Sequence, residues 1–334
     1  MTAGTQRGKA LWMLMAGTAF WAISFPTIKA LNLTQDSLLP GGSSWFFTSL
    51  LVTCRFGLAS LALLVLALPG LRAMTALEVR QGLGIGLFGG IGIILQTDGL
   101  AHTSASTSAF LSQCYCIFIP LWISLRSRRL PSLTVLASCA MVMAGVAVLS
   151  DLDLKTMRMG RGELETILST VLFTGQILWL ERPVFSGNDV KRFSVICFAV
   201  MSLLSLPLAF LTAPEPSSLI TAWGSPAAVG FLGILIVFCT LGGYMIMNRW
   251  QREVPAVEAG LIYCLEPIFA GALALFLPHW LSLWANVSYA NETLNPNGIL
   301  GGALIIGANV LIQVVPVLKS RWRRAAPVRS AQRG

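Results

Sequence analysis

The chain has 334 residues, of which 55% are hydrophobic and only 11% are charged, and its mean hydropathy is +0.74. A soluble domain carries roughly 25% charged residues, so this chain has too few charges to cover a surface exposed to water. The composition excludes a soluble enzyme, a disordered chain and a nucleic-acid-binding domain, and the net charge of +9 needs another explanation.

Ten mostly apolar stretches of about 20 residues follow one another, each long enough to cross a hydrocarbon core of roughly 30 Å. The sequence therefore predicts an all-α polytopic integral membrane protein with ten transmembrane helices. In chain order, the expected spans are residues 10–31, 46–69, 80–100, 104–125, 132–150, 163–181, 193–212, 223–247, 256–278 and 298–317.

Most of the 23 lysines and arginines fall between alternate spans, on the side that also holds both chain ends. Cytoplasmic loops of membrane proteins carry such an excess of basic residues. We therefore expect both termini in the cytoplasm, and the short loops are typical of a bacterial inner (cell) membrane. The basic tail is expected to lie beside anionic lipid, not nucleic acid.

The spans form two sets of five, and the openings of the fourth and ninth spans resemble each other. Ala105 matches Ala256, and Ala109 matches Gly260, at a spacing of 151 residues. Because five is odd, the two halves must cross the membrane in opposite orientations, as in inverted-repeat transporters whose substrate site lies near the midplane. The expected domains are a first five-helix repeat, an outer linker, a second five-helix repeat and a basic cytoplasmic tail, over residues 1–150, 151–162, 163–317 and 318–334.

Several motifs occur in a fixed order along the spans. The first span contains Phe20-Trp-Ala-Ile-Ser-Phe-Pro-Thr-Ile-Lys29, and the second contains a single arginine, Arg55. The third span enters the fourth through Gly99-Leu-Ala-His-Thr-Ser-Ala-Ser-Thr-Ser-Ala-Phe-Leu111, and the ninth contains Ala259-Gly-Leu-Ile-Tyr-Cys-Leu-Glu-Pro-Ile-Phe269. Over residues 10–317, this ordered set resembles the drug/metabolite transporter superfamily, specifically its EamA-like family. The resemblance implies export of small organic metabolites, such as amino acids or related compounds, by alternating access.

Two charged residues lie near the middle of predicted spans. A bare carboxylate costs a few kcal/mol there, so Glu266 is by default a candidate functional residue. It is either a proton-coupling group or a carboxyl bonded permanently to backbone or to a neighbouring helix. Arg55 either makes internal ion pairs and hydrogen bonds or binds an anionic group. The segment 279–297 is unusually long for the family, and it is either an interfacial segment or a lid over the outer vestibule.

Aromatic and amide side chains within the spans are further candidates for substrate contact. Small-molecule sites place a few such groups against apolar walls, although each also serves as a hydrogen bond between helices. These candidates are Trp21, Gln96, Gln113, Tyr115, Gln176 and Tyr263.

Two prolines predict helix bends because each removes one backbone hydrogen bond. Pro120 frees the carbonyl of Cys116, and Pro267 frees the carbonyl of Tyr263. On the 151-residue alignment Pro267 matches Cys116, not Pro120. We therefore expect the two bends to lie about one helical turn apart, which makes the halves asymmetric.

Three functional hypotheses follow from these features. The first is a proton-coupled exporter that uses Glu266, and the second is an uncoupled exchanger or facilitator. The third, a polytopic enzyme acting on lipid-linked substrates, would need a cluster of acids, histidines or serines at one interface. The sequence shows no such cluster and only 2 histidines. We expect no catalytic residue, metal or cofactor; the expected partners are a small-molecule substrate, the lipid bilayer and protons.

Overall fold

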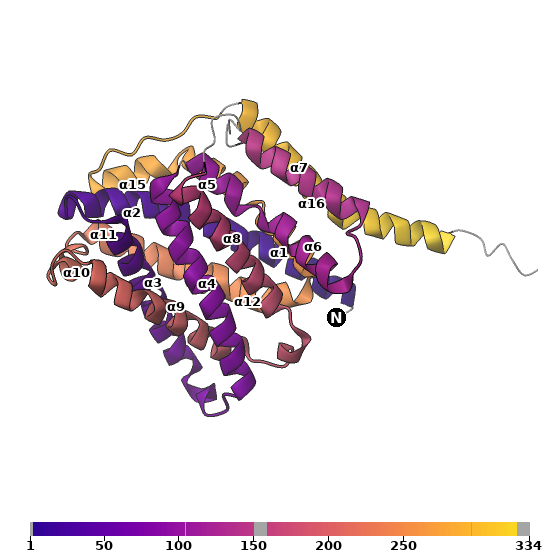
Figure 1. Ribbon diagram of the computed structural model, residues 1–334, viewed down its shortest axis with the longest axis horizontal. Helices are drawn as coiled ribbons and strands as arrows, with labels where there is room; N and C mark the ends of the chain where they lie inside the picture. Colours follow the sequence, from indigo (N-terminus) through magenta and orange to yellow (C-terminus); the bar gives the residue numbers. More distant parts are fainter. Residues whose placement is uncertain (1–2, 104, 150–158, 295, 326–334) are drawn as a thin grey trace, which may run out of the picture.

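The computed structural model describes residues 3–103, 105–149, 159–294 and 296–325, and every regular element in these ranges is a helix (Figure 1). Within these ranges, 7 helical segments are long and apolar enough to cross a membrane. The chain is therefore an all-helical protein of the polytopic membrane class. The 7 segments are Thr5–Leu38, Ser44–Leu71, Ala76–His102, Val190–Thr212, Pro226–Glu253, Ala256–Ala274 and Pro296–Val315.

The helices follow the predicted spans closely, although several spans are built from more than one helix. The α-helices are α1 (Ala3–Ala22), α2 (Ser24–Leu38), α3 (Ser44–Leu71), α4 (Ala76–His102), α5 (Ala105–Ser112), α6 (Tyr115–Ser127), α7 (Leu133–Leu149), α8 (Arg161–Leu180), α9 (Val190–Thr212), α10 (Ser218–Thr221), α11 (Pro226–Ile234), α12 (Met245–Trp250), α13 (Ala256–Tyr263), α14 (Glu266–Ala274), α15 (Leu277–Ala285) and α16 (Pro296–Ala325). Two short 3₁₀-helices, η1 (Pro183–Phe185) and η3 (Gln251–Glu253), and one π-helix, η2 (Leu235–Tyr244), complete the set.

Three of the ten predicted spans are not among these 7 segments. Helix α7 has only 17 residues. The stretch 104–125 is interrupted between α5 and α6. Helix α8 is more polar because it carries Glu163, Glu165 and Gln176. At the other extreme, α16 continues past the predicted end of the last span. Residues 326–334 of the predicted basic tail and residues 151–158 of the predicted linker lie outside the described residues.

The centre of the molecule is a bundle in which α3 packs on α9, and α4 packs on both α8 and α9. Glycines on α4 let the backbones approach closely, as is common between membrane helices. A methyl group on Gly82 would lie 2.5 Å from the carbonyl oxygen of Phe193, and one on Gly86 would lie 2.7 Å from Cβ of Val200. This contact therefore tolerates no side chain unless the helices separate.

We expect Gly82→Ala to destabilise the protein by about 1–3 kcal/mol, the usual cost of overpacking a close contact. The matched control is Gly233→Ala, because Gly233 also lies in a helix but has nothing within 4 Å of its added methyl group. Thermal unfolding of the purified protein in detergent, followed by tryptophan fluorescence, should show a lower Tm for Gly82→Ala alone. Equal Tm values for the two variants would contradict this account of the α4–α9 contact.

Basic side chains tie several connections together at one end of the bundle, which we call the basic end. Arg192 donates from Nη1 to the carbonyl oxygen of Ala73 (2.7 Å), and Arg252 donates from Nη2 to that of Phe185 (2.7 Å). Arg7, on α1, forms an ion pair of 2.7 Å with Glu258. These contacts gather the start of α1, the α3–α4 and α8–α9 connections and the start of α13, which belong to segments predicted to be cytoplasmic.

A buried acid joins three helices at the opposite end. Asp98, near the end of α4, accepts a hydrogen bond of 2.8 Å from Oγ of Ser44 on α3. It also pairs with Arg161 at the start of α8. Charged side chains therefore hold the central bundle together at both of its ends.

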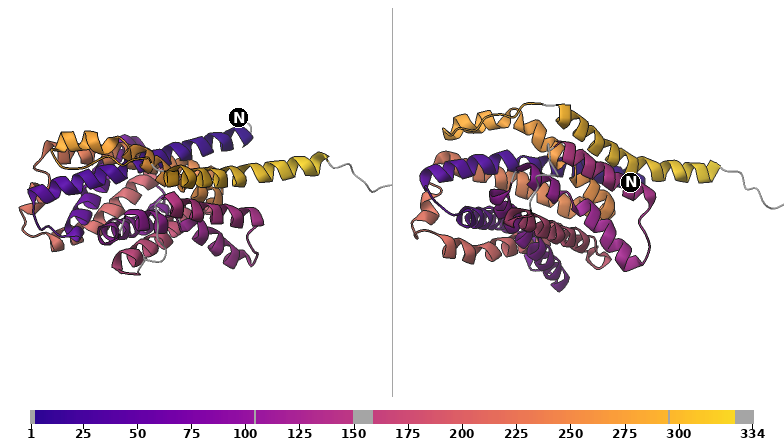
Figure 2. Two further views of the ribbon diagram at one scale, coloured as in Figure 1. Left: turned by 90° about the horizontal axis from the view of Figure 1, so that it is seen from above. Right: turned by 45° about the horizontal axis from the view of Figure 1, so that its top comes forward.

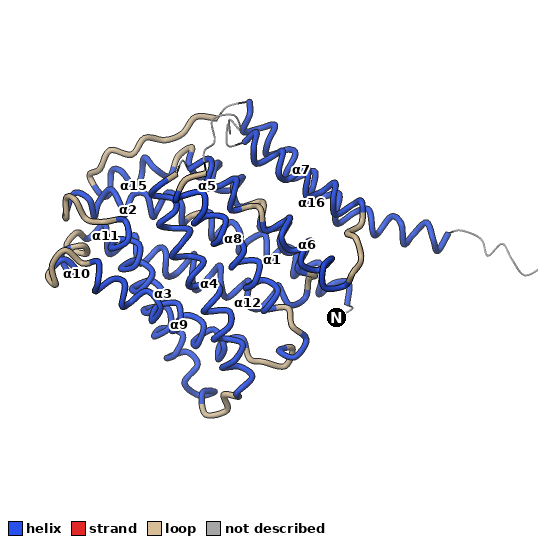
Figure 3. The backbone as a smooth tube through the Cα atoms, viewed as in Figure 1, coloured by secondary structure: helices blue, strands red, loops and turns tan. Residues whose placement is uncertain are grey.

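Helices α7 and α16 pack along each other at the edge of the molecule, outside the central bundle (Figures 1 and 2). The last turns of α16 extend beyond the other helices (Figure 2). Irregular segments join the helices at their ends (Figure 3). The candidate functional site lies inside the bundle, between α1, α4, α8 and α13.

Candidate functional site

A cavity of about 1010 Å³, including its open mouth, lies among helices from both halves of the chain. Its wall combines one acid, one arginine, three tyrosines and a tryptophan with glutamine, serine, threonine and apolar side chains. The predicted candidates that line it are Trp21, Arg55, Gln96, Tyr115, Gln176, Tyr263 and Glu266. These seven residues come from α1, α3, α4, α6, α8, α13 and α14, so the fold brings together positions that are far apart in the sequence.

Gln113 is the one predicted contact that does not line the cavity. Its side chain is buried, and its Oε1 atom accepts a hydrogen bond of 2.8 Å from the hydroxyl group of Tyr115. Gln113 therefore contributes to the site indirectly, because it binds the hydroxyl group of Tyr115, which lines the cavity.

The sequence reasoning also missed part of the wall. Tyr244 lines the cavity, as do Ser24, Thr97, Ser108 and Ser112. The chain has only 4 tyrosines, and the criterion that selected Tyr115 and Tyr263, a tyrosine inside a span, selects Tyr244 equally well. Serine and threonine are common in membrane helices, so no sequence signal separates these four from the rest.

The cavity lies beside two helix interruptions, one in each half of the chain. Helix α5 ends at Ser112 and α6 begins at Tyr115, whereas α13 ends at Tyr263 and α14 begins at Glu266. Both breaks are tight turns with hydrogen bonds to the third residue back, such as Gln113 N to Phe110 O (3.2 Å) and Leu265 N to Ile262 O (3.0 Å). The residue after each break, Tyr115 or Glu266, lines the cavity.

The second interruption lies directly before Pro267, where a bend was predicted, whereas the first does not lie at Pro120. Pro120 lies inside α6, and the interruption precedes it at residues 113–114. The carbonyl of Cys116, which Pro120 leaves free, accepts a hydrogen bond of 3.0 Å from the thiol of Cys139. Pro267 lies in the first turn of α14, where its missing N–H group costs nothing. The two interruptions are therefore 151 residues apart, and the expected displacement of one turn is not observed.

Arg55 and Glu266 are the charged side chains of the cavity wall. Nε of Arg55 donates a hydrogen bond of 2.7 Å to the hydroxyl oxygen of Thr240. In the described part of the chain, Glu266 has neither a hydrogen-bond partner nor an ion pair, and the two charges do not pair with each other. The carboxyl group of Glu266 thus faces the cavity, and its oxygen atoms are available to bind a proton or a ligand.

Aromatic side chains form the wall next to these charges. The ring centre of Trp21 lies 5.4 Å from that of Tyr244 and 5.2 Å from that of Tyr263. The hydroxyl group of Tyr263 donates to Oε1 of the buried Gln251 (2.8 Å), and Nε2 of Gln251 donates to the carbonyl oxygen of Ile177 (2.9 Å). This chain of hydrogen bonds fixes Tyr263 against α8.

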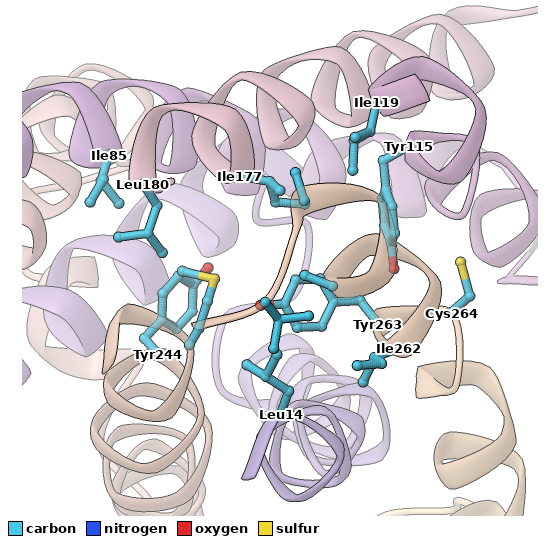
Figure 4. Close-up of a cluster of buried hydrophobic side chains, with 14 of the residues drawn as sticks. Leu14, Ile85, Tyr115, Ile119, Ile177, Leu180, Tyr244, Ile262, Tyr263 and Cys264 are labelled. Carbon is cyan, nitrogen blue, oxygen red and sulfur yellow. The ribbon is translucent and has the colours of Figure 1, made fainter. Parts of the chain in front are cut away.

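Buried apolar side chains close the cavity toward the basic end. They include Leu14, Ile85, Ile119, Leu180 and Ile262, and Figure 4 shows several of them around Tyr244 and Tyr263. Toward the opposite end the cavity wall continues to Ile28, Leu100 and Ser108. The structure therefore has a filled core on one side of the charged residues and a cavity on the other.

The long segment 279–297 contributes no described residue to the cavity wall. Helix α15 packs on α2, α11 and α14, and the ring of Trp284 lies 5.0 Å from that of Phe231. Trp280 and Leu283 on the same helix are 65% and 63% exposed. These exposed apolar side chains favour the interfacial segment over the lid, since interfacial helices carry such a face.

Comparisons with known proteins bear on the fold and on the class of protein. No family model matches the chain. An uncharacterized transporter of Archaeoglobus fulgidus is 23% identical over 294 residues, which cover 88% of this chain and 82% of that protein. This is a transporter-like integral membrane protein. A protein of known crystal structure has a similar fold, with a TM-score of 0.65 and 17% identity over 94% of this chain and 99% of that one.

Proposed function

We propose that this protein is a secondary transporter of the EamA-like family that exports a small organic metabolite, such as an amino acid or related compound, by alternating access. The observation that carries this proposal is the cavity beside two helix interruptions, in which Glu266 and Arg55 face the interior without pairing. Transporters build their sites from such broken helices near the middle of the membrane.

We also propose that the chain has ten spans in two inverted repeats. Seven of these spans are the long apolar segments, and the other three are α5 with α6, α7 and α8. The 151-residue spacing of the interruptions supports it, and α5 and α13, which precede them, have 8 residues each. The helix contacts support it too. The second spans of the two halves, α3 and α9, pack on each other, and so do the fifth, α7 and α16.

The distribution of basic residues supports an orientation with the basic end and both termini in the cytoplasm of a bacterial cell. In that orientation the apolar core around Leu14 and Leu180 closes the cytoplasmic side, and the cavity extends toward the outside. The structure then corresponds to an outward-facing state of the transport cycle. The state that faces the cytoplasm requires α8 to separate from α13, which breaks the hydrogen bonds of Gln251.

Proton coupling through Glu266 is the energy source we propose. An unpaired carboxyl group in the cavity can take up a proton from one side and release it to the other as the site alternates. The competing mechanism is an uncoupled exchanger or facilitator, in which Glu266 contacts the solute only.

Transport by the purified protein in liposomes tests the proposal. The vesicles are loaded with a mixture of amino acids and related metabolites, and mass spectrometry measures which compounds leave, with and without a pH gradient. We expect one chemical class to leave faster than from protein-free vesicles, and faster still with the gradient. Efflux that ignores the gradient would support the exchanger, and no efflux of any compound would overturn the proposed function.

A further inference from the structure

A π-helical segment interrupts the helix that runs from α11 to α12 beside the cavity. Residues Leu235–Tyr244 form η2, in which backbone hydrogen bonds reach five residues back instead of four. Such segments are rare, and they occur frequently at functional sites because the wider turn reorients side chains. The last residue of η2, Tyr244, lines the cavity.

Thr240 lies within η2 and connects it to Arg55. Its hydroxyl group donates to the carbonyl oxygen of Leu235 (3.1 Å), five residues earlier, which is the π-helical spacing. Because the proton of the hydroxyl is used there, its oxygen accepts the hydrogen bond from Nε of Arg55. Both residues are buried. The π-turn therefore determines where the guanidinium group lies.

The other two nitrogens of the guanidinium group have no polar partner among the residues that the structure describes. Neither Nη atom of Arg55 makes a hydrogen bond or an ion pair within the described ranges, although the side chain is only 4% exposed and lines the cavity. The ring of its neighbour Phe56, at 5.2 Å, offers a weak cation–π contact. A buried charge without a counter-charge costs free energy. An anionic ligand would therefore bind most favourably next to the guanidinium group of Arg55.

The same segment positions a second donor. Gly243 of η2 leaves room for Trp21, since a methyl group there would lie 2.5 Å from Nε1 of that indole. Nε1 of Trp21 and Nε2 of Gln176 are both buried with no hydrogen-bond partner in the described part of the chain, and both side chains line the cavity. The wall thus offers several free donors.

The charge balance decides between classes of anion. Among the described residues of the wall, Arg55 is the only cation and Glu266 the only acid. The single positive charge of Arg55 balances the single negative charge of a carboxylate. A phosphate dianion carries two negative charges, so one of them would stay unbalanced beside the carboxyl group of Glu266. The two Nη atoms also present the fork geometry that binds both oxygens of a carboxylate.

We propose that Arg55 binds a carboxylate group of the transported solute, and that Thr240 on the π-helical segment is the positioning residue that orients its guanidinium group. This proposal rests on the proposed transport function, because it assigns a ligand to the same cavity. It assigns no role in the transport step to Thr240 itself.

Binding to the purified protein tests this proposal without any transport. The probes are carboxylic acids of small metabolites and their primary amides, used as matched pairs, and isothermal calorimetry gives a Kd for each. We expect the best acid to bind at least about tenfold more tightly than its amide. The neutral amide cannot accept the pair of charge-assisted hydrogen bonds that the guanidinium group donates to a carboxylate. Arg55→Gln should abolish this preference.

The Thr240 variants separate positioning from folding. Thr240→Val, which lacks the hydroxyl group, should reduce the acid-to-amide preference by about five- to tenfold, and Thr240→Ser should restore it to within about twofold. The matched control is Thr34→Val, because Thr34 is also buried but its hydroxyl group bonds, among the described residues, only to the carbonyl oxygen of Ala30. A merely structural role of Thr240 would weaken acids and amides alike.

Equal binding of acids and amides to the wild type, or no binding of any acid, overturns the carboxylate proposal. A Thr240→Val variant with the preference of the wild type overturns the role of Thr240. These outcomes are distinguishable from failure of the proposed function. Transport without acid preference contradicts only the present inference, whereas Arg55-dependent acid binding without transport contradicts only the transporter.

Discussion

Replacing Glu266 with glutamine should abolish accumulation of the solute driven by a pH gradient. A gradient of one pH unit stores about 1.4 kcal/mol per proton, which supports about tenfold accumulation when one proton is exchanged for each solute. Glutamine has nearly the same shape but binds no proton at this pH. The accumulation ratio should therefore fall from about 10 to about 1.

The measurement uses liposomes whose membrane potential is clamped, with an imposed gradient of about one pH unit. Exchange of labelled for unlabelled solute at equal pH should persist in Glu266→Gln, because it needs no net proton movement. Glu292→Gln is the matched control, since Glu292 is exposed in the segment after α15. Tenfold accumulation by Glu266→Gln would remove this residue from the coupling mechanism and leave the uncoupled exchanger.

Replacing Glu78 with alanine should destabilise the fold by about 3 kcal/mol, the lower range for breaking a buried ion pair. The Glu78 side chain is 1% exposed and forms an ion pair of 2.8 Å with Arg192 on α9. It also accepts hydrogen bonds from the backbone N–H of Thr75 (2.8 Å), which caps α4, and of Asp189 (2.9 Å). One side chain thus holds the start of α4 to the start of α9.

Thermal unfolding in detergent should show a Tm lower by about 5–10 °C for Glu78→Ala. Glu78→Gln keeps an acceptor without the charge and should lose about half as much. Glu215→Ala is the control, because Glu215 is exposed and its side chain accepts a hydrogen bond only from Ser217 among the described residues, and we expect a change within about 0.5 kcal/mol. A Tm of Glu78→Ala equal to that of Glu215→Ala would show that this contact contributes little.

The general organisation was predictable because the bilayer imposes a local rule. A membrane helix must satisfy its backbone within the segment and present apolar side chains to lipid, so each span is visible in a window of about 20 residues. Glu266 and Arg55 stood out by the same rule, as rare charges inside apolar runs. These two charged residues and five of the six aromatic and amide candidates line one cavity.

The sequence reasoning failed where the answer depends on the rotation of a helix or on a contact across the fold. Gln113 resembles Gln96 and Gln176 in the sequence, but its side chain points to Tyr115 and not into the cavity. The break between α5 and α6 contains no proline, so the search for Pro120 placed the irregularity too late in the chain.

The sequence by itself determined that this chain is a helical membrane protein, where its 7 long apolar segments lie and which charges are unusual there. Transfer from water to lipid depends on each segment separately, so composition and spacing suffice. The π-helical segment, the hydrogen bond from Arg55 to Thr240 and the cavity were decided only by the tertiary structure. They depend on contacts between residues as far apart as Arg55 and Thr240, and such contacts exist only when the two halves pack together.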